Sequence, residues 1–145
     1  MRGSHLLKHW SGTQKAVTLS SAEAELGGIV KGAGEGLGLQ SLCRDLGLEL
    51  DLGLHADSSA AVGICRRTGI GRVRHLAVGQ LWVQERLRDG DFKLYKVLGA
   101  ANPADLLTKH LARDTIDKHL ETMSIMRAEG RAASAPTVNA EVREL

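Results

Sequence analysis

The sequence predicts an α/β fold, and three observations indicate it. Short apolar runs at 5–10, 50–56 and 91–98 are typical of β-strands. The segments between them carry helix signals, beginning with a capping box in which Glu23 follows Ser20 by three residues. The run LDLGLHA at 50–56 is nearly continuous in apolar character, as strands buried in parallel sheets are. Alternating strands and helices predict a sheet covered by helices.

The first expected helix spans 21–45, and its apolar residues include Leu26 and Ile29. It also holds six glycines, at positions 27, 28, 32, 34, 36 and 38. Each glycine inside a helix costs about 0.5–1 kcal/mol relative to alanine. The segment GAGEGLG lacks the GxGxxG spacing of a phosphate-binding loop, and no strand precedes it. We interpret the glycines as sites of close helix packing or as plain loss of helix propensity.

Residues typical of helix starts and turns predict where the later helices begin and end. We expect further helices at 58–67, 75–89, 103–111 and 114–127. Asp57 closes the strand at 50–56, and Asp89-Gly90 marks the turn that ends the second of these helices. Asn102 suits an N-cap and Pro103 the first helical position.

The length of 145 residues indicates one main domain. We expect this domain at 1–112, a C-terminal helix at 113–128, and a disordered tail at 129–145, where residues are small and polar. Cys43 and Cys65 fall in expected helices and should pack as thiols, without a disulfide or a metal.

The composition narrows the function classes. The aromatic content of 3% disfavours a stacking platform for single-stranded nucleic acid, and the net charge of +2 does not by itself indicate a nucleic-acid partner. No apolar stretch approaches the ~20 residues of a membrane helix, and no signal peptide is present. We therefore expect a soluble protein inside the cell, in the cytoplasm or nucleus, with no membrane partner.

Three acidic signatures lie at element boundaries: SSAEAE at 20–25, HADSSA at 55–60 and NPADLLTK at 102–109. Carboxylates there can converge if the fold gathers strand ends and helix starts at one point. Oxygen ligands in that arrangement suit Mg²⁺, and two such ions can promote hydrolysis of a phosphodiester.

The order and surroundings of these motifs resemble the ribonuclease H domain of copia-type retrotransposon polyproteins. The resemblance runs from about Leu6 to Leu111 and includes HLLKHWSGTQKAVTLSSAEAEL, LHADSSAAV, VRHLAVGQLWVQERLRDGDFKLYKV and NPADLLTKHL. It implies Mg²⁺-dependent hydrolysis of the RNA strand of an RNA–DNA hybrid during reverse transcription.

The resemblance implies that Glu25, Asp57 and Asp105 are the catalytic and metal-binding residues. Each has a structural alternative. Asp57 could be a plain helix N-cap, and Asp105 could simply favour the helix dipole. Glu23 competes with Glu25 for the metal but already has a role in the capping box. His75 is weighed as catalytic only because the family has a histidine there, and a structural role is the main alternative.

Basic residues could hold the backbone of the hybrid. Arg66, Arg67, Arg72 and Arg74 fall within nine residues, and Lys93 and Lys96 could add phosphate contacts. The alternative is a solvated basic surface.

Domains of this family begin with two strands, of which the first carries a further catalytic aspartate. Here Met1 directly precedes the third-strand region, and positions 1–22 contain no Asp or Glu. The resemblance therefore implies a truncated ribonuclease-H-like fold that lacks the first two strands and has an extra C-terminal helix. We expect at most one weak Mg²⁺ site and little cleavage.

Two alternatives stay open. The first is an inactive transposon remnant that binds nucleic acid weakly. The second is a fragment that needs a partner, either the reverse transcriptase part of a polyprotein or another chain that supplies the missing strands.

Overall fold

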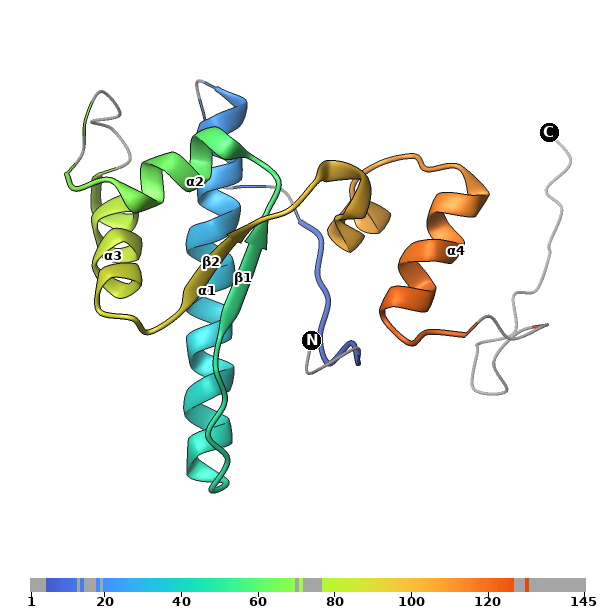
Figure 1. The fold of residues 1–145 in the computed structure, drawn as a ribbon, viewed down its shortest axis with the longest axis horizontal. Coiled ribbons are helices and arrows are strands. Elements are labelled where there is room, and N and C mark those ends of the chain that lie inside the picture. The colour runs from blue at the N-terminus through green and yellow to red at the C-terminus, as the bar shows by residue number, and fades with distance from the viewer. Residues whose placement is uncertain are drawn as a thin grey trace, which may run out of the picture.

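Helices and strands alternate along the chain. The computed structural model describes residues 5–12, 14, 18, 20–69, 71, 77–126 and 130, with only the backbone at Ala77 and Leu107. The elements are α1 (Ser21–Asp45), β1 (Gly53–Ala56), α2 (Ser59–Arg66), α3 (Ala77–Arg88), β2 (Lys93–Lys96), the 3₁₀ helices η2 (Gly99–Ala101) and η3 (Pro103–Leu107), and α4 (Arg113–Thr122). The α/β class is thus confirmed (Figure 1).

The sheet of the described residues has two parallel strands, β1 and β2. Leu54 pairs with Leu94 and His55 with Tyr95. Parallel neighbours need a crossover, which α2 and α3 supply. Both strands are shorter than the predicted 50–56 and 91–98.

Helix α1 has the predicted bounds. The Ser20 side chain accepts a hydrogen bond from the backbone N–H of Glu23 at 3.3 Å, which fixes the first turn. The buried apolar residues of α1 are Leu26, Ile29 and Ala33, all in its first half. Its second half extends beyond the other helices (Figure 1).

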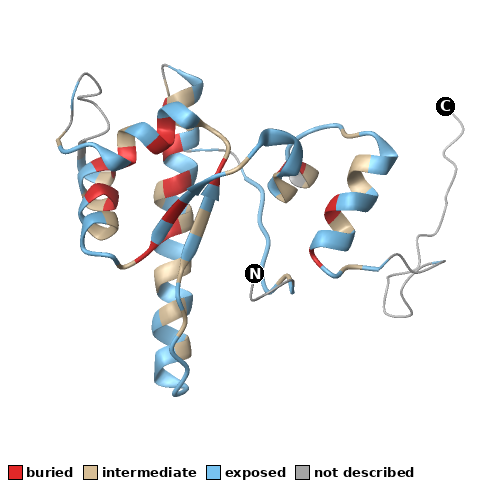
Figure 2. Cartoon of the chain, in the orientation of Figure 1, coloured by how far each residue is buried: buried red, intermediate tan, exposed pale blue. Residues whose placement is uncertain are grey.

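The core lies between the sheet and helices α1, α2 and α3 (Figure 2). Its buried members are Leu26, Ile29, Ala33, Ala56, Ala61, Val62, Cys65, Val83, Phe92 and Leu94. Cys43 and Cys65 are both free thiols, and Cys65 is buried in the core while Cys43 is only partly buried. Burial raises the pKa of the Cys65 thiol to about 11, so this group stays protonated and behaves as a small apolar side chain.

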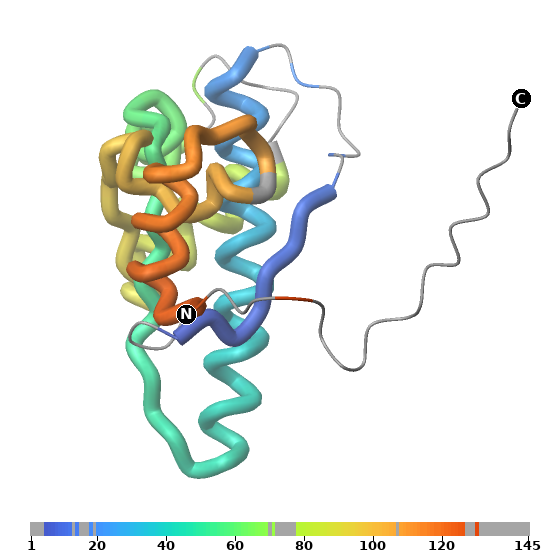
Figure 3. The backbone as a smooth tube through the Cα atoms, turned by 90° about the vertical axis from the view of Figure 1, so that its right-hand side faces the viewer, coloured from blue at the N-terminus to red at the C-terminus, as the bar shows by residue number. Residues whose placement is uncertain are grey.

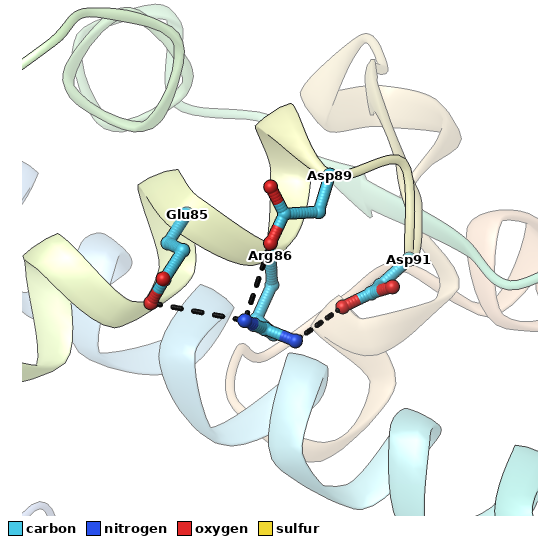
Figure 4. A network of polar contacts seen from close by, with 4 residues as sticks. All are labelled: Glu85, Arg86, Asp89 and Asp91. Atoms are coloured by element: carbon cyan, nitrogen blue, oxygen red, sulfur yellow. Dashed lines mark hydrogen bonds and ion pairs between the residues drawn. The ribbon is translucent and has the colours of Figure 1, made fainter.

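The α3–β2 turn is held by Arg86 (Figure 4). Its guanidinium contacts Asp91 at 2.8 Å, Asp89 at 3.2 Å and Glu85 at 3.8 Å. The predicted turn residue Gly90 has a φ of +81°, a conformation that favours glycine. This turn directs the chain into β2.

The predicted strand at 5–10 is wrong. Only His5 forms an isolated bridge, and residues 6–10 have no regular structure. A strand needs a neighbour for its backbone hydrogen bonds, and the described sheet consists of β1 and β2. The segment runs alongside α1 instead (Figure 3). The Lys8 ammonium contacts the Glu35 carboxylate at 2.6 Å and ties the two together.

The predicted helix at 103–111 is also wrong in type and length. Asn102 caps it as expected, with its side chain accepting from Ala104 N–H at 3.2 Å, but the segment is a 3₁₀ helix that ends at Leu107. The predicted helix at 114–127 corresponds to α4, which packs against η3. Apart from Gly130, the expected disordered tail lies outside the described residues. None of the described helices combines the length and apolarity needed to cross a membrane.

Candidate functional site

Asp57 directly follows the carboxyl end of β1. The N-cap of α2 is Ser58, whose side chain accepts from Ala61 N–H at 3.2 Å, so the alternative of Asp57 as the helix cap is wrong. The Asp57 carboxylate is therefore not used in capping. Its backbone is held by Lys96, which donates to the Asp57 carbonyl at 2.5 Å and to the Val97 carbonyl at 3.0 Å.

Asp105 reaches the same edge of the sheet through the chain that leaves β2. This chain passes close to Asp57, since a Cβ placed on Gly99 would lie 3.7 Å from Asp57 Oδ2. The Asn102 cap and Pro103 then start η3, which carries Asp105. The Asp105 side chain is only 13% exposed, and its Oδ2 accepts a hydrogen bond from Lys109 Nζ at 2.9 Å.

Glu25 approaches from the first turns of α1. The pKa of its carboxyl group is raised by partial burial and then by the negative charges of Asp57 and Asp105, while Lys109 opposes the shift. These effects require the groups to lie near one another. The charges of Asp57 and Asp105 therefore reach Glu25, and we call these three residues the carboxylate cluster. Glu23, in contrast, is 8% exposed and lies at the α1 cap.

The carboxylate cluster combines three acids from three elements with two neighbouring cations, Lys109 at the Asp105 carboxylate and Lys96 at the Asp57 carbonyl. Its oxygen donors are of the kind that Mg²⁺ prefers. Over the described ranges, however, no three carboxylate, imidazole or thiol groups lie close enough to hold a metal ion as they stand. Ion binding here would require the side chains to close in, and Lys109 to share or release Asp105.

The predicted basic surface is only partly described. Arg66 donates to the Leu94 carbonyl at 2.9 Å, which ties its guanidinium to β2. Arg67 is exposed. Arg72, Arg74 and His75 lie outside the described residues. Lys93 contacts Asp51 at 3.4 Å, at the far end of β1 from Asp57.

Sequence reasoning did not single out Lys109 or the backbone role of Lys96. A signal for Lys109 was present, because it follows Asp105 by four residues, the spacing at which a helical turn pairs opposite charges. Nothing local shows that Lys109 also acts on Glu25 and Asp57.

A second acidic group lies on α4. An open pocket there is lined by Asp114, Asp117 and Glu121 together with Thr115 and Lys118. These acids come from one short helix, whereas the carboxylate cluster joins α1, β1 and η3.

Comparison with known proteins adds the origin of the chain. It is 30% identical over 106 residues to the retrovirus-related Pol polyprotein from transposon TNT 1-94 of Nicotiana tabacum, a match that covers 72% of this chain and 8% of that polyprotein. It is 26% identical over 128 residues to the retrovirus-related Pol polyprotein from transposon RE1 of Arabidopsis thaliana, covering 86% of this chain and 9% of the relative.

The chain thus spans less than a tenth of the length of either relative. No protein-family model matches it, and no solved structure matches it. The similarity to two plant transposon polyproteins supports an origin in a retrotransposon polyprotein.

Proposed function

We propose, from this origin in a retrotransposon polyprotein, that the chain is a ribonuclease-H-like domain that hydrolyses the RNA strand of RNA–DNA hybrids with Mg²⁺. One observation carries the proposal. Acids from three separate elements interact electrostatically at the carboxyl end of β1, the edge at which α/β sheets bind ligands. Neighbouring negative charges destabilise the folded chain, and groups whose pKa is shifted in this way are typical of functional sites.

The oxygen donors present suit a divalent cation in type, but no three acidic, histidine or cysteine groups of the described residues lie close enough to hold one without moving. Glu25, Asp57 and Asp105 offer carboxylate oxygens, and their mutual repulsion raises the pKa of Glu25, a repulsion that a cation would relieve. The carboxylate cluster already binds one positive group, because the Lys109 ammonium contacts the Asp105 carboxylate.

In the proposed reaction the carboxylate cluster would hold one divalent ion. Bound Mg²⁺ would supply the polarisation of water and the stabilisation of the leaving oxygen that phosphodiester hydrolysis needs. Lys96 fixes the backbone of Asp57 and thereby the direction in which this carboxylate leaves β1. Arg67, with Arg72 and Arg74, is proposed to contact phosphates of the hybrid, which gives affinity without sequence preference.

The test is cleavage of a hybrid duplex with a labelled RNA strand, in Mg²⁺ or Mn²⁺. We expect slow cleavage, because no three acidic, histidine or cysteine groups of the described residues lie close enough to hold an ion without moving. EDTA should abolish it, and Asp57→Asn should reduce it by about 100-fold or more, since one charged ligand is lost.

The matched control is Asp51→Asn, the same change at the opposite end of β1. The Asp51 side chain is 92% exposed and pairs with Lys93 at 3.4 Å, so its loss should leave cleavage unchanged. Cleavage that survives Asp57→Asn would contradict the proposal. Salt-sensitive hybrid binding without cleavage would favour the inactive nucleic-acid-binding remnant instead.

A partner chain is the second proposal for this function. The described residues place β2 on one edge of β1 and no strand on the other, so β1 can accept a further strand. A peptide covering the segment that precedes the matched region in the tobacco polyprotein should raise the cleavage rate if it completes the sheet. An unchanged rate at saturating peptide would count against this partner.

A further inference from the structure

Two buried amide side chains of α3, those of Gln80 and Gln84, hold the turn that follows α2. They are only 1% and 3% exposed, and we call them the amide pair. The Gln84 amide bonds both backbone groups of Gly69, since its Oε1 accepts from the Gly69 N–H and its Nε2 donates to the Gly69 carbonyl, each at 3.1 Å. Gln80 Nε2 donates to the same carbonyl at 3.4 Å. Gln84 Nε2 also donates to the Ile64 carbonyl at 2.9 Å, so one amide joins α2 to the turn.

The turn itself is described at residues 67–69 and 71, which we call the Gly69 turn. Gly69 has a φ of +84° and Gly71 a φ of +60°, conformations that favour glycine. A Cβ added to Gly71 would lie 2.7 Å from Arg67 Cζ. The Arg67 guanidinium therefore lies against the Gly71 backbone, across the turn that the amide pair holds.

The amide pair occupies positions that suit apolar side chains. Its neighbour on α3, Val83, is 0% exposed and belongs to the core. Burying an amide in such a place is unfavourable unless hydrogen bonds compensate it. For both glutamines, bonds to Gly69 supply that compensation. The burial of the two amides is thus coupled to the shape of the Gly69 turn.

Positive charge gathers where the Gly69 turn begins. Arg66 and Arg67 are both exposed at the end of α2, and Arg66 is held by its bond to the Leu94 carbonyl at 2.9 Å. The sequence from Arg66 to Arg74 contains no acidic residue. A guanidinium carries five N–H donors in one plane, a geometry that matches phosphate oxygens. The chemistry of this surface therefore suits a phosphodiester backbone.

We propose that Gln84, assisted by Gln80, is a positioning residue for nucleic-acid binding, because it fixes the Gly69 turn from which the Arg67 guanidinium binds a phosphate of the hybrid. The inference rests on the hybrid binding in the proposed function. A turn that is fixed before binding loses little conformational freedom when the duplex binds, and this raises the affinity. The contribution of Arg67 to binding should therefore depend on Gln84.

The experiment is fluorescence anisotropy of a labelled RNA–DNA hybrid, with EDTA present so that no cleavage interferes. The full chain is compared with Arg67→Gln, Gln84→Met and the double variant. At about 0.1 M salt, the loss of one phosphate contact in Arg67→Gln should weaken binding about eightfold and reduce the salt slope by about one. Gln84→Met should weaken binding by about two- to tenfold. In the Gln84→Met background, Arg67→Gln should cost less than about twofold, a coupling that a merely structural glutamine would not produce.

The matched control is Gln40→Met on α1. Gln40 Nε2 donates to the Leu50 carbonyl at 2.7 Å, so this variant also loses an amide bond to a loop, but away from the arginines. It should leave both the hybrid affinity and the effect of Arg67→Gln unchanged. A second variant, Gln80→Met, removes the longer bond of the amide pair and should reduce the effect of Arg67→Gln in the same direction. It replaces Gln84→Met if circular dichroism shows that Gln84→Met does not fold.

The outcomes separate this inference from the proposed hydrolysis. An undiminished effect of Arg67→Gln in the Gln84→Met background would overturn the positioning role, even where the wild type cleaves the hybrid. Coupling between Arg67 and Gln84 without any cleavage in Mg²⁺ would support the positioning role and contradict hydrolysis. No hybrid binding by the wild type at low salt would overturn both.

Discussion

The glycines of α1 allow a quantitative test of how this helix packs. Gly34 and Gly38 have no atom within 4 Å of an added Cβ, whereas a Cβ on Gly36 would lie 2.7 and 2.8 Å from the two terminal carbons of Leu52. Close packing and plain loss of helix propensity, the two interpretations of these glycines, therefore each apply at different positions. Gly36 allows close packing, and Gly34 and Gly38 only lower helix propensity.

The magnitudes follow from this difference. Gly34→Ala and Gly38→Ala should each raise the free energy of unfolding by about 0.5–1 kcal/mol, because alanine favours the helix and meets nothing. For a chain of 145 residues that is a rise in melting temperature of about 1–4 °C each. Gly36→Ala has the same propensity gain, but the displaced Leu52 should cost about 1–3 kcal/mol, so the net effect is neutral or destabilising.

The assay is urea unfolding followed by circular dichroism at 222 nm, with equal slopes required for the comparison. In a Leu52→Ala background the clash is gone, and Gly36→Ala should then stabilise as Gly34→Ala does. A Gly36→Ala variant that is as stabilising as Gly34→Ala with Leu52 present would refute the reasoning.

Three further substitutions test the core, one side-chain hydrogen bond and the charge of Glu25. Phe92→Ala removes a core ring that is 2% exposed and should cost about 3–5 kcal/mol by urea unfolding. Arg66→Met removes the hydrogen bond to the Leu94 carbonyl and should lower the free energy of unfolding by about 1 kcal/mol, measured in urea. An unchanged free energy of unfolding would contradict a stabilising role for this hydrogen bond. Glu25→Gln should raise the melting temperature at pH 7 and lose that advantage below pH 4.5. The folded-state pKa of Glu25 is raised above 4.5, so its favourable contribution exists in acid and disappears as the pH rises through that pKa. If the gain in melting temperature did not depend on pH, the raised pKa of Glu25 could not be its cause.

The predictions from sequence that hold are those with a local cause. The Ser20 cap and the pattern after it place α1 at Ser21–Asp45, and Asp89-Gly90 marks the turn after α3. The strand at 5–10 fails because a strand depends on its neighbour, which no local pattern contains. The helix at 103–111 fails at its end, since Thr108 N–H bonds the Asp105 carbonyl three residues back and the 3₁₀ turn closes there.

The candidate site shows the same division. The resemblance indicates Glu25, Asp57 and Asp105, and in the fold the charges of Asp57 and Asp105 act on Glu25. Their role as ligands stays a prediction. The Asp57 cap was a reasonable local alternative, but Ser58 takes that position. The sequence does not reveal the effect of Lys109 on Glu25, because that effect exists only in the folded chain.

The most direct test of the central claim is relaxation by Mn²⁺ in ¹H–¹⁵N NMR spectra. At substoichiometric Mn²⁺, the amide signals of Glu25, Asp57 and Asp105 should broaden first, and Mg²⁺ should reverse the effect. Signals of Gly47, beyond the far end of α1, and of Glu121 on α4 should persist. Broadening centred on α4, where Asp114 and Asp117 also line a pocket, or spread evenly over the chain, would contradict the claim that the carboxylate cluster binds the ion.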